Sequence, residues 1–242
     1  MEQKKAIVVG ASSGIGQGLA AELVKHGYKV GITGRRKQNL LDIQQSNPEQ
    51  YVAKCFDVQV AEDSLSCYKA LIDELGGLDL LIYSSGNGFE NKDLRFDIEL
   101  DTIKTNTIGF TNLVTYTFNY FKAQKKGQIA VITSIAGFRG NPDFPAYFAT
   151  KSYLLSYLEG LRIKSIREKL NICITDLRAG FVKTGHVDPK KMIWATSVEV
   201  AAKQMYNAIK KKKKVAYILK RWRIVAGFLK IVPRFIYDRL PL

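Results

Sequence analysis

Short apolar runs alternate along the chain with longer segments in which apolar residues recur every three or four positions. The apolar runs cover residues 6–9, 29–33, 51–56, 78–83, 128–133 and 171–177. The segments between them have the helical period over residues 15–25, 37–46, 61–75, 97–122 and 145–169. Strands that are apolar throughout are typical of a parallel sheet with both faces covered. The pattern therefore predicts an α/β protein in which strands and helices alternate.

The order of these elements indicates how they are connected. Parallel strands joined by helices through right-handed crossovers form a Rossmann-like, doubly wound parallel sheet with helices on both faces. Past residue 177 the pattern loosens, and we interpret residues 178–197 as a lid, followed by a helix over 197–211 and a short strand over 215–219. The sheet would then have six to seven strands. We expect residues 1–219 to form a single domain and residues 220–242 a C-terminal tail.

A glycine-rich segment joins the first strand to the first helix. It reads Gly10-Ala11-Ser12-Ser13-Gly14-Ile15-Gly16. Glycine permits both a tight turn and a close approach of the backbone to a ligand. The helix that follows offers free N–H groups and the positive end of its dipole to an anion. A glycine turn without a ligand is the alternative, but the strand-turn-helix context favours a site for the pyrophosphate of a dinucleotide.

The ends of the next two strands bear on which dinucleotide binds. Where an NAD enzyme usually offers a carboxylate to the ribose 2′-hydroxyl, this chain has Arg35 and Arg36. Two guanidinium groups can bind a 2′-phosphate, so we predict NADP(H) as the cofactor. A solvated basic pair at the start of a helix is the alternative interpretation. Asp57, just before Val58, can accept a hydrogen bond from the adenine amino group or cap the next helix.

Three polar residues have the spacing of a catalytic site. Tyr147 and Lys151 are four residues apart in a predicted helix and therefore share a face. Because a nearby ammonium favours tyrosinate, we expect Lys151, aided by the positive nicotinamide of the oxidised cofactor, to lower the pKa of Tyr147 from ~10 toward neutrality, so that the phenol can transfer a proton. Ser134 follows an apolar strand, at the edge of the sheet where ligands bind in such folds. A Tyr-x-x-x-Lys pair alone is a common surface feature, but the serine and the glycine segment favour the catalytic interpretation.

In these motifs the chain resembles the short-chain dehydrogenase/reductase family, in its short single-domain form, over residues 5 to about 210. The resemblance implies an NADPH-dependent carbonyl reductase that acts reversibly as an alcohol dehydrogenase. Tyr147 would donate a proton to the carbonyl oxygen while NADPH delivers hydride to the carbon. Ser134 would orient the carbonyl, and Lys151 would also bind the nicotinamide ribose.

The same resemblance implies roles for five further residues. Asn106 corresponds to the helix-borne asparagine that supports a lysine-linked water chain. Gly86 corresponds to the glycine whose loop passes the adenosine ribose, and Gly180, Val182 and Thr184 correspond to contacts on the nicotinamide side.

Two segments depart from the family's usual pattern. Tyr83-Ser84-Ser85-Gly86 stands where Asn-Asn-Ala-Gly is common, and Ala179-Gly180 stands where Pro-Gly is usual. Neither change touches the proton-transfer residues, so we expect activity to be retained. The first change mildly favours a different class of function, a nucleotide-binding regulatory or scaffolding protein that keeps the fold without turnover.

The composition argues against several other classes of protein. Three cysteines do not make a disulfide framework, and no cysteine or histidine cluster suggests a metal site. We expect buried, reduced thiols and a cytoplasmic protein. The apolar run near the N-terminus is too short for a signal-peptide core or a membrane span. His26 closes a predicted helix, whereas His186 lies in the predicted lid and could touch the substrate.

Positive charge is concentrated at the C-terminal end. The formal net charge is +15, and residues 210–242 hold eleven Lys and Arg residues and one Asp. The rest of the chain is nearly balanced and has no basic helix or aromatic ladder, so we do not expect it to bind nucleic acid. Within the tail, basic residues are interspersed with apolar residues at helical spacing, namely Trp222, Val225, Leu229, Val232 and Ile236. This pattern predicts one basic amphipathic helix from Trp222 to Tyr237.

Two roles for this tail stay open. It can lie on an anionic membrane surface, which would make the protein peripheral at the inner face of a membrane, or it can pack across a partner subunit or the substrate cleft. The helices over 97–122 and 145–169 resemble the surfaces through which the family forms dimers and tetramers, so we expect a homo-oligomer. An apolar ketone or aldehyde substrate is suggested by Phe181, Val182, Met192, Ile193 and Trp194.

Overall fold

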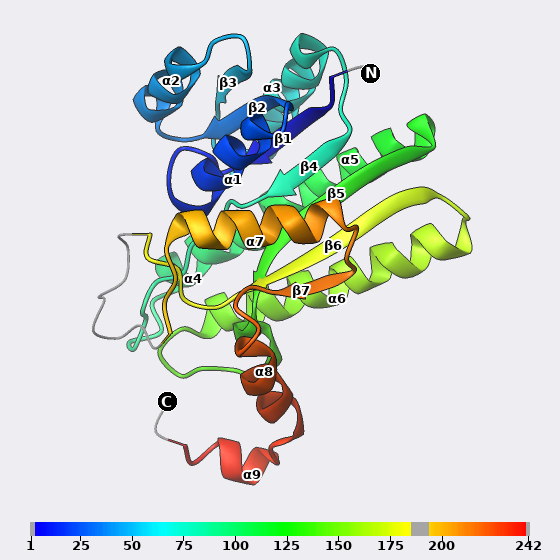
Figure 1. The fold of residues 1–242 in the computed structure, drawn as a ribbon. Coiled ribbons are helices and arrows are strands. Elements are labelled where there is room, and N and C mark those ends of the chain that lie inside the picture. Colours follow the sequence, from blue (N-terminus) through cyan, green and yellow to red (C-terminus); the bar gives the residue numbers. More distant parts are fainter. Residues whose placement is uncertain (1–2, 185–193, 241–242) are drawn as a thin grey trace.

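Seven parallel strands form one sheet, and helices cover both of its faces (Figure 1). The computed structural model describes residues 3–184 and 194–240. The strand order is β3-β2-β1-β4-β5-β6-β7, and each neighbouring pair is parallel. The strands are β1 (Lys5–Val9), β2 (Lys29–Gly34), β3 (Tyr51–Cys55), β4 (Leu80–Tyr83), β5 (Lys126–Ser134), β6 (Asn171–Ala179) and β7 (Val215–Tyr217). The predicted doubly wound sheet is confirmed.

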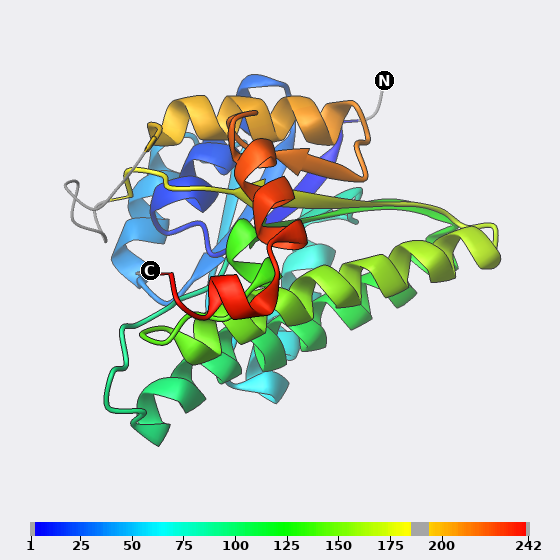
Figure 2. The ribbon, with the colours of Figure 1, turned by 90° about the horizontal axis from the view of Figure 1, so that it is seen from below.

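Helices lie on both sides of the sheet (Figure 2), and two apolar layers hold them there. On one face lie α1 (Gly14–Lys25), α2 (Lys37–Ser46) and α7 (Val198–Lys210), and on the other lie α3 (Ala61–Leu75), α5 (Phe110–Gln124) and α6 (Pro145–Arg167). Successive residues of a strand point to opposite faces. Accordingly Ala6 and Val8 enter the first layer, and Ile7 and Val9 enter the second. This double burial explains why the strands are apolar throughout.

The strand order reverses between β1 and β4, which are neighbours in the sheet. In open α/β sheets, ligands bind at the carboxyl ends of the strands where the order reverses. The glycine-rich segment between β1 and α1 lies at this point. The fold therefore places the predicted phosphate loop in the crevice that such sheets offer to a ligand.

The predicted helix over 97–122 is interrupted in the structure. It consists of α4 (Phe96–Ile103), a π-helical turn η1 (Lys104–Gly109) and α5. Gly109 packs so closely on the chain after β3 that a Cβ added to it would lie 2.6 Å from the carbonyl oxygen of Val58. The wider turn places the side chain of Asn106 inside the protein, where the residue is only 1% exposed. Single π turns often mark functional positions, and this one carries a predicted site residue.

Other boundaries also differ from the prediction. Strand β6 continues through Ala179, so the first two residues of the predicted lid are strand, and residues 185–193 of that lid lie outside the described residues. The predicted burial of the thiols is wrong, since Cys55 is exposed and Cys67 and Cys173 are half-buried. All three cysteines are free.

The tail forms two helices in place of the predicted one. They are α8 (Trp222–Ile231) and α9 (Arg234–Tyr237). Pro233 separates them because proline has no backbone N–H to continue the first helix. Helix α8 packs on the 3-10 turn that follows β5, and α9 lies beyond α8 (Figure 1). Over residues 3–184 and 194–240, no helix combines the length and the apolar character needed to cross a bilayer.

Candidate active site

The glycine-rich loop is folded too tightly for side chains. Gly10 has a φ of +85°, and a Cβ added to it would lie 2.6 Å from the backbone nitrogen of Ser85. A Cβ on Gly16 would lie 2.0 Å from the carbonyl oxygen of Gly10. The loop therefore needs both glycines to bring the start of α1 against the end of β4. Together with the free N–H groups at the start of α1, this shape fits the pyrophosphate of a dinucleotide.

Arg36 folds over the same loop. Its Nε and Nη2 donate to the Oγ of Ser12, both at 3.1 Å, and its Nη2 also donates to the Oγ of Ser13. Asn39 donates from Nδ2 to the carbonyl oxygen of Ser12 at 3.1 Å. A guanidinium group and two hydroxyl groups thus meet at the end of β2, where the 2′ position of the adenosine ribose is read in this fold. Asn39 was missed because a single asparagine in a helix carries no sequence signal.

Arg35 and Asp57 form an exposed ion pair beside this cluster. Their closest atoms, Nη1 and Oδ2, are 3.7 Å apart. Asp57 also accepts from the backbone N–H of Gln59 at 3.0 Å, but the N-cap of α3 is Val60. Asp57 therefore shapes the turn before α3 and does not cap the helix. The side chain of Val58 is buried, so only its backbone can take part in this edge of the site.

Ser134, Tyr147 and Lys151 meet as the sequence predicts. Ser134 is the last residue of β5, and Tyr147 and Lys151 share a face of α6. The Nζ of Lys151 lies 5.5 Å from the centroid of the Tyr147 ring and 3.4 Å from the carbonyl oxygen of Ile132. A hydrogen bond joins Tyr147 to Ser134. The three side chains of the predicted catalytic set therefore occupy one cluster at the carboxyl end of the sheet.

The predicted direction of the tyrosine pKa is wrong for the protein on its own. Burial raises the pKa of Tyr147, because a phenolate loses its hydration there, and the hydrogen bond with Ser134 opposes this rise. Burial also lowers the pKa of Lys151 to about 8, against the charge of Asp176, which raises it. The phenol is therefore held in its neutral, proton-donating form. The ammonium charge that was expected to acidify it is itself destabilised by burial.

Asn106 ties the π turn to the catalytic helix. Its Nδ2 donates to the carbonyl oxygen of Asn87 at 2.8 Å and to the Oγ1 of Thr150 at 3.0 Å, and its Oδ1 accepts from the N–H of Asn87 at 2.9 Å. Thr150 in turn donates to the carbonyl oxygen of Tyr147 at 2.8 Å. A Cβ on Gly86 would lie 3.3 Å from Asn106 and 3.6 Å from the Nζ of Lys151. The space beside Gly86 is therefore bounded by the asparagine and the lysine.

A buried charge cluster under the site escaped the sequence analysis. Asp176 is fully buried, accepts from the Oγ1 of Thr133 and pairs with the Nε of Arg178 at 2.7 Å. Arg178 also donates to the hydroxyl of Tyr217 at 2.8 Å and lies over the ring of Phe138. Alternating charged residues in an otherwise apolar strand are the signal that could have revealed this cluster.

The segment after β6 lies close to the phosphate loop. Thr184 approaches Gly14, where an added Cβ would lie 3.2 Å from the Cγ2 of Thr184. Val182 is buried and forms a bridge with Thr196. A Cβ on Gly180 would lie 2.1 Å from the indole Nε1 of Trp222. Position 180 must therefore be glycine for Trp222, the first residue of α8, to pack against it. Trp222 is thus a neighbour of the predicted nicotinamide-side segment that sequence analysis did not assign to the site.

The unusual Tyr83 supports the π turn. Its ring is buried, and its hydroxyl donates to the carbonyl oxygen of Thr105 at 3.3 Å, next to Asn106. The ring also meets Phe110 edge-on, with centroids 5.4 Å apart. Tyr83 therefore stabilises the backbone that carries Asn106. His26, in contrast, ends α1 and stacks on Tyr206 at 4.0 Å, which is a structural role, while His186 lies outside the described residues.

Known proteins share both the sequence pattern and the fold. Residues 4–192 match the family model for short chain dehydrogenases. An uncharacterized oxidoreductase from Myxococcus xanthus is 33% identical over 189 residues, which cover 76% of this chain and 74% of that protein.

Two solved structures share the fold at low sequence identity. A short-chain dehydrogenase/reductase from Burkholderia phymatum, in complex with NAD, superposes with a TM-score of 0.86 at 16% identity and covers 100% of this chain and 97% of that one. ElxO with NADP bound has a TM-score of 0.78 at 21% identity and covers 90% of this chain and 97% of that one.

The glycine loop, the cluster at the carboxyl end of the sheet and the similarity to these proteins all indicate the same kind of ligand. The residues of the loop and of the cluster fit a nicotinamide dinucleotide, whose phosphates the start of α1 would receive and whose reactive end would lie beside Tyr147 and Lys151. The chain belongs to the short-chain dehydrogenase/reductase family of nicotinamide-dependent oxidoreductases.

Proposed function

We propose that the protein is an NADPH-dependent carbonyl reductase that also works in reverse as an alcohol dehydrogenase. The observation that supports it most is the meeting of Ser134, Tyr147 and Lys151 at the carboxyl end of the sheet. The cofactor supplies a hydride to the carbonyl carbon when it is bound. Tyr147, held neutral by burial, donates its proton to the carbonyl oxygen. Ser134 donates a hydrogen bond to the same oxygen and keeps it beside the phenol.

Lys151 and Asn106 keep the tyrosine supplied with protons in this scheme. Lys151 is 7% exposed and reaches the carbonyl oxygen of Ile132, so its ammonium has a fixed position beside the phenol. Asn106 holds the backbone of Asn87 and, through Thr150, the first turn of α6. The Oδ1 of Asn87 is buried with no partner among the residues that the structure describes. It offers an acceptor to a water or ligand group at this point.

NADP(H) is the proposed cofactor because basic groups lie where the adenosine ribose is read. Arg36 bends over Ser12 and Ser13, and Arg35 stands beside it. The carboxylate of Asp57 lies 3.7 Å from Arg35, and we assign it to a hydrogen bond with the adenine amino group. A 2′-phosphate would be received by charge-assisted hydrogen bonds.

The substrate that we propose is an apolar ketone or aldehyde. Its site would be bordered by Trp222, Phe181 and Trp194, whose rings form a cluster with centroids 5.7 to 5.8 Å apart around Trp222. Met192 and Ile193 lie outside the described residues. A panel of ketones and aldehydes offered with NADPH tests the function. Oxidation of NADPH with at least one of them, and its loss in Tyr147→Phe, is expected.

The alternative is a nucleotide-binding regulatory or scaffolding protein without turnover. It would bind NADPH tightly and oxidise it with no carbonyl in the panel. The intact contacts among Ser134, Tyr147 and Lys151 favour the enzyme, and Tyr83 stabilises the site backbone instead of disturbing it. We therefore keep the reductase as the principal proposal.

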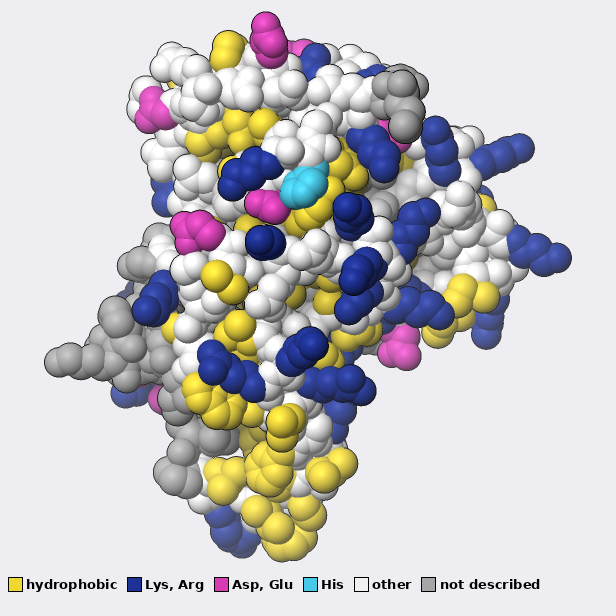
Figure 3. All heavy atoms as spheres, in the orientation of Figure 1, with side chains coloured by type: hydrophobic (Ala, Val, Ile, Leu, Met, Phe, Trp, Pro, Cys, Tyr) yellow, Lys and Arg dark blue, Asp and Glu magenta, His cyan; other side chains and the backbone are white. Residues whose placement is uncertain are grey.

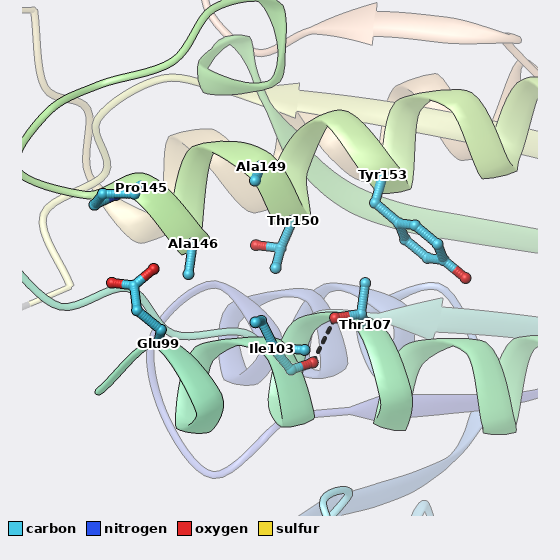
Figure 4. A pocket seen from close by; sticks show the side chains of 8 residues that line it. All are labelled: Glu99, Ile103, Thr107, Pro145, Ala146, Ala149, Thr150 and Tyr153. Carbon is cyan, nitrogen blue, oxygen red and sulfur yellow. Dashed lines mark hydrogen bonds between the residues drawn. The ribbon is translucent and has the colours of Figure 1, made fainter. Parts of the chain in front are cut away.

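We propose a homo-oligomer formed through α6 and the helical segment made of α4, η1 and α5. A pocket lies between these helices, where Ala146, Ala149, Thr150 and Tyr153 face Glu99 and Ile103 (Figure 4). The same helical segment exposes further apolar side chains, including Phe96 at 74% and Ile108 at 50% exposure. Measuring the mass in solution of the wild type and of Ile103→Glu tests this surface, since a charged side chain there is expected to dissociate the oligomer.

Two further assignments concern where the protein works. Free cysteines support a reducing, cytoplasmic location. The basic, partly apolar tail supports a second partner, an anionic membrane surface at the inner face of a membrane.

A further inference from the structure

Within the apolar stripe predicted from the tail's sequence, the residues from Trp222 to Val232 face the protein itself, whereas Ile236 is exposed. Trp222 and Val232 are 6% exposed, and Val225 and Leu229 are half-buried. Ala226, one turn after Trp222, is fully buried. This side of α8 packs on the 3-10 turn η2 (Ile135–Phe138), which directly follows Ser134. It is therefore not the side that can meet a membrane.

A second apolar stripe lies on the outer side of the tail. It consists of Ile224, Phe228 and Ile231, at i, i+4 and i+7 of α8, and of Phe235 in α9, and we call it the tail stripe. Their exposed fractions are 78%, 53%, 80% and 65%, respectively. Figure 3 shows hydrophobic side chains gathered over α8 and α9, with Lys and Arg side chains next to them. Contiguous exposed apolar side chains of this kind mark an interaction surface.

Basic side chains border the tail stripe. Arg223 directly precedes Ile224 in α8 and Arg234 opens α9 just before Phe235, whereas Arg221, the N-cap of α8, and Lys230 lie over the rings of Trp194 and Phe138. Between Lys210 and Leu240 the single acidic residue is Asp238. A partner for this surface must accept apolar side chains and carry negative charge around them. An anionic lipid bilayer offers both, because its acyl boundary receives the apolar groups and its headgroups meet the basic ones.

The tail is held firmly in the orientation that exposes the stripe. The guanidinium of Arg139 donates to the carbonyl oxygens of Leu229, at 2.6 Å from Nε, and of Val232. The hydroxyl of Tyr237 donates to the carbonyl oxygen of Gly140 at 2.7 Å, and Lys230 lies 4.6 Å from the centroid of the Phe138 ring. The end of α8 is thereby capped by the protein body, so the tail stripe does not need to fold on binding.

The same contacts fix the tail stripe beside the active site. Phe138 and Arg139 follow Ser134 by four and five residues, and Trp222 rests on Gly180. We propose that the tail stripe docks on an anionic lipid bilayer and thereby places the carboxyl end of the sheet at the bilayer surface. An apolar carbonyl compound dissolved in the bilayer would then enter the site without crossing water. This second part rests on the proposed reductase function, whereas the docking does not.

Sedimentation with vesicles tests the docking without reference to activity. The tail variant replaces Ile224, Phe228, Ile231 and Phe235 by serine. The matched control replaces four exposed apolar residues elsewhere by serine, namely Val60, Leu94, Ile166 and Val200. With vesicles that contain phosphatidylglycerol, we expect the wild type and the control to sediment. The partition coefficient of the tail variant onto these vesicles should be at least about tenfold lower than that of the wild type, because each lost side chain removes apolar area from the acyl boundary.

Charge and assembly are separated in the same experiment. Vesicles of phosphatidylcholine alone, or high salt, should reduce sedimentation of the wild type, since the headgroup attraction is screened. Equal sedimentation of the wild type and the tail variant would overturn the proposal. A fall in oligomeric mass of the tail variant, with no vesicle binding by the wild type, would instead identify a second copy of the chain as the occupant of the stripe.

Substrate delivery is tested with two carbonyl compounds of the same chemical group. One is water-soluble, and the other is a long-chain analogue incorporated in phosphatidylglycerol vesicles. The tail variant should reduce the soluble compound like the wild type and the vesicle-borne compound about tenfold more slowly. If the wild type and the tail variant reduced the vesicle-borne compound at equal rates, as they should the soluble one, delivery from the bilayer would be contradicted. Absence of turnover of the soluble compound by the wild type would contradict the reductase function itself and leave the sedimentation result standing.

Discussion

The ammonium nitrogen of Lys151 lies 5.5 Å from the centroid of the Tyr147 ring at the carboxyl end of the sheet, where Lys151 is buried and Tyr147 is half-buried. Burial acts on the two groups in opposite directions. It raises the pKa of Tyr147 and lowers the pKa of Lys151 to about 8. Each group is therefore pushed toward its neutral form. This relationship has consequences for both stability and rate.

Lys151→Met should stabilise the protein while it abolishes catalysis. Because the pKa of Lys151 falls from 10.5 in the unfolded chain to about 8 in the folded protein, the unfolded chain binds more protons between these values. The charged lysine therefore costs stability below pH 8, and this cost disappears as the pH rises through 10.5. At pH 7 the free energy of unfolding of the variant should be roughly 3 kcal/mol higher than that of the wild type. Chemical denaturation without nucleotide measures it.

The control for this stability change is Lys203→Met, which replaces an exposed lysine of α7. It should change the free energy of unfolding by less than about 0.5 kcal/mol at any pH. If Lys151→Met is not more stable than the wild type at pH 7, burial of the charged lysine does not destabilise the folded protein.

The rate of carbonyl reduction should decline on the alkaline side. Above pH 8 the ammonium of Lys151 loses its proton, so kcat/KM should fall as the pH rises through about 8. Asp176 raises the pKa of Lys151, and Asp176→Asn removes that charge. The fall should then move to lower pH. A pH profile of kcat/KM for both proteins measures the shift, and an unchanged profile in a folded variant would show that Asp176 has no electrostatic part in the site.

Gly10→Ala and Gly27→Ala form a matched pair for the phosphate loop. Their φ angles are +85° and +80°, so both substitutions strain the backbone by about 1–2 kcal/mol. Only Gly10 has close neighbours, since nothing lies within 4 Å of a Cβ on Gly27. Gly10→Ala should cost a further ~1–3 kcal/mol and weaken nucleotide binding. Thermal unfolding and nucleotide titration measure both, and equal behaviour of the two variants would argue against the loop's close contact with β4.

Arg36→Gln tests the proposed preference for NADP(H). Loss of the guanidinium should raise the KM for NADPH by about tenfold and leave the KM for NADH nearly unchanged, because only NADPH carries the 2′-phosphate. Lys37→Gln removes a neighbouring exposed charge and should affect neither value strongly. Equal effects of Arg36→Gln on the two nucleotides would assign the arginine to a structural role at Ser12 and Ser13.

Hydrophobic periodicity was sufficient for the sheet and for most helices because each strand is buried on both faces. It did not reveal the π turn at Asn106, which depends on the contact between Gly109 and Val58. It also chose one apolar side of α8 and missed the other. Both sides carry apolar residues, and contacts from Arg139 and Gly180, far away in sequence, decide which side is buried.

For the site, spacing on one helix predicted the approach of Tyr147 and Lys151 correctly, because residues four apart share a face. The direction of the tyrosine pKa was not predictable in the same way. It depends on how completely the phenol is buried, which only the packing of the whole site determines. Thr150 and Asn87 were missed for a similar reason, since their roles are hydrogen bonds to Asn106 that span distant segments.

Deuterium transfer tests the central claim most directly. NADPH that carries deuterium at the transferable C4 position is incubated with an apolar ketone, and the alcohol is examined by mass spectrometry. With the wild type, we expect deuterium on the carbinol carbon. Tyr147→Phe should bind NADPH normally and form product at least ~10²-fold more slowly, because the proton donor is missing. Alcohol without deuterium, or an undiminished rate in Tyr147→Phe, would contradict that claim.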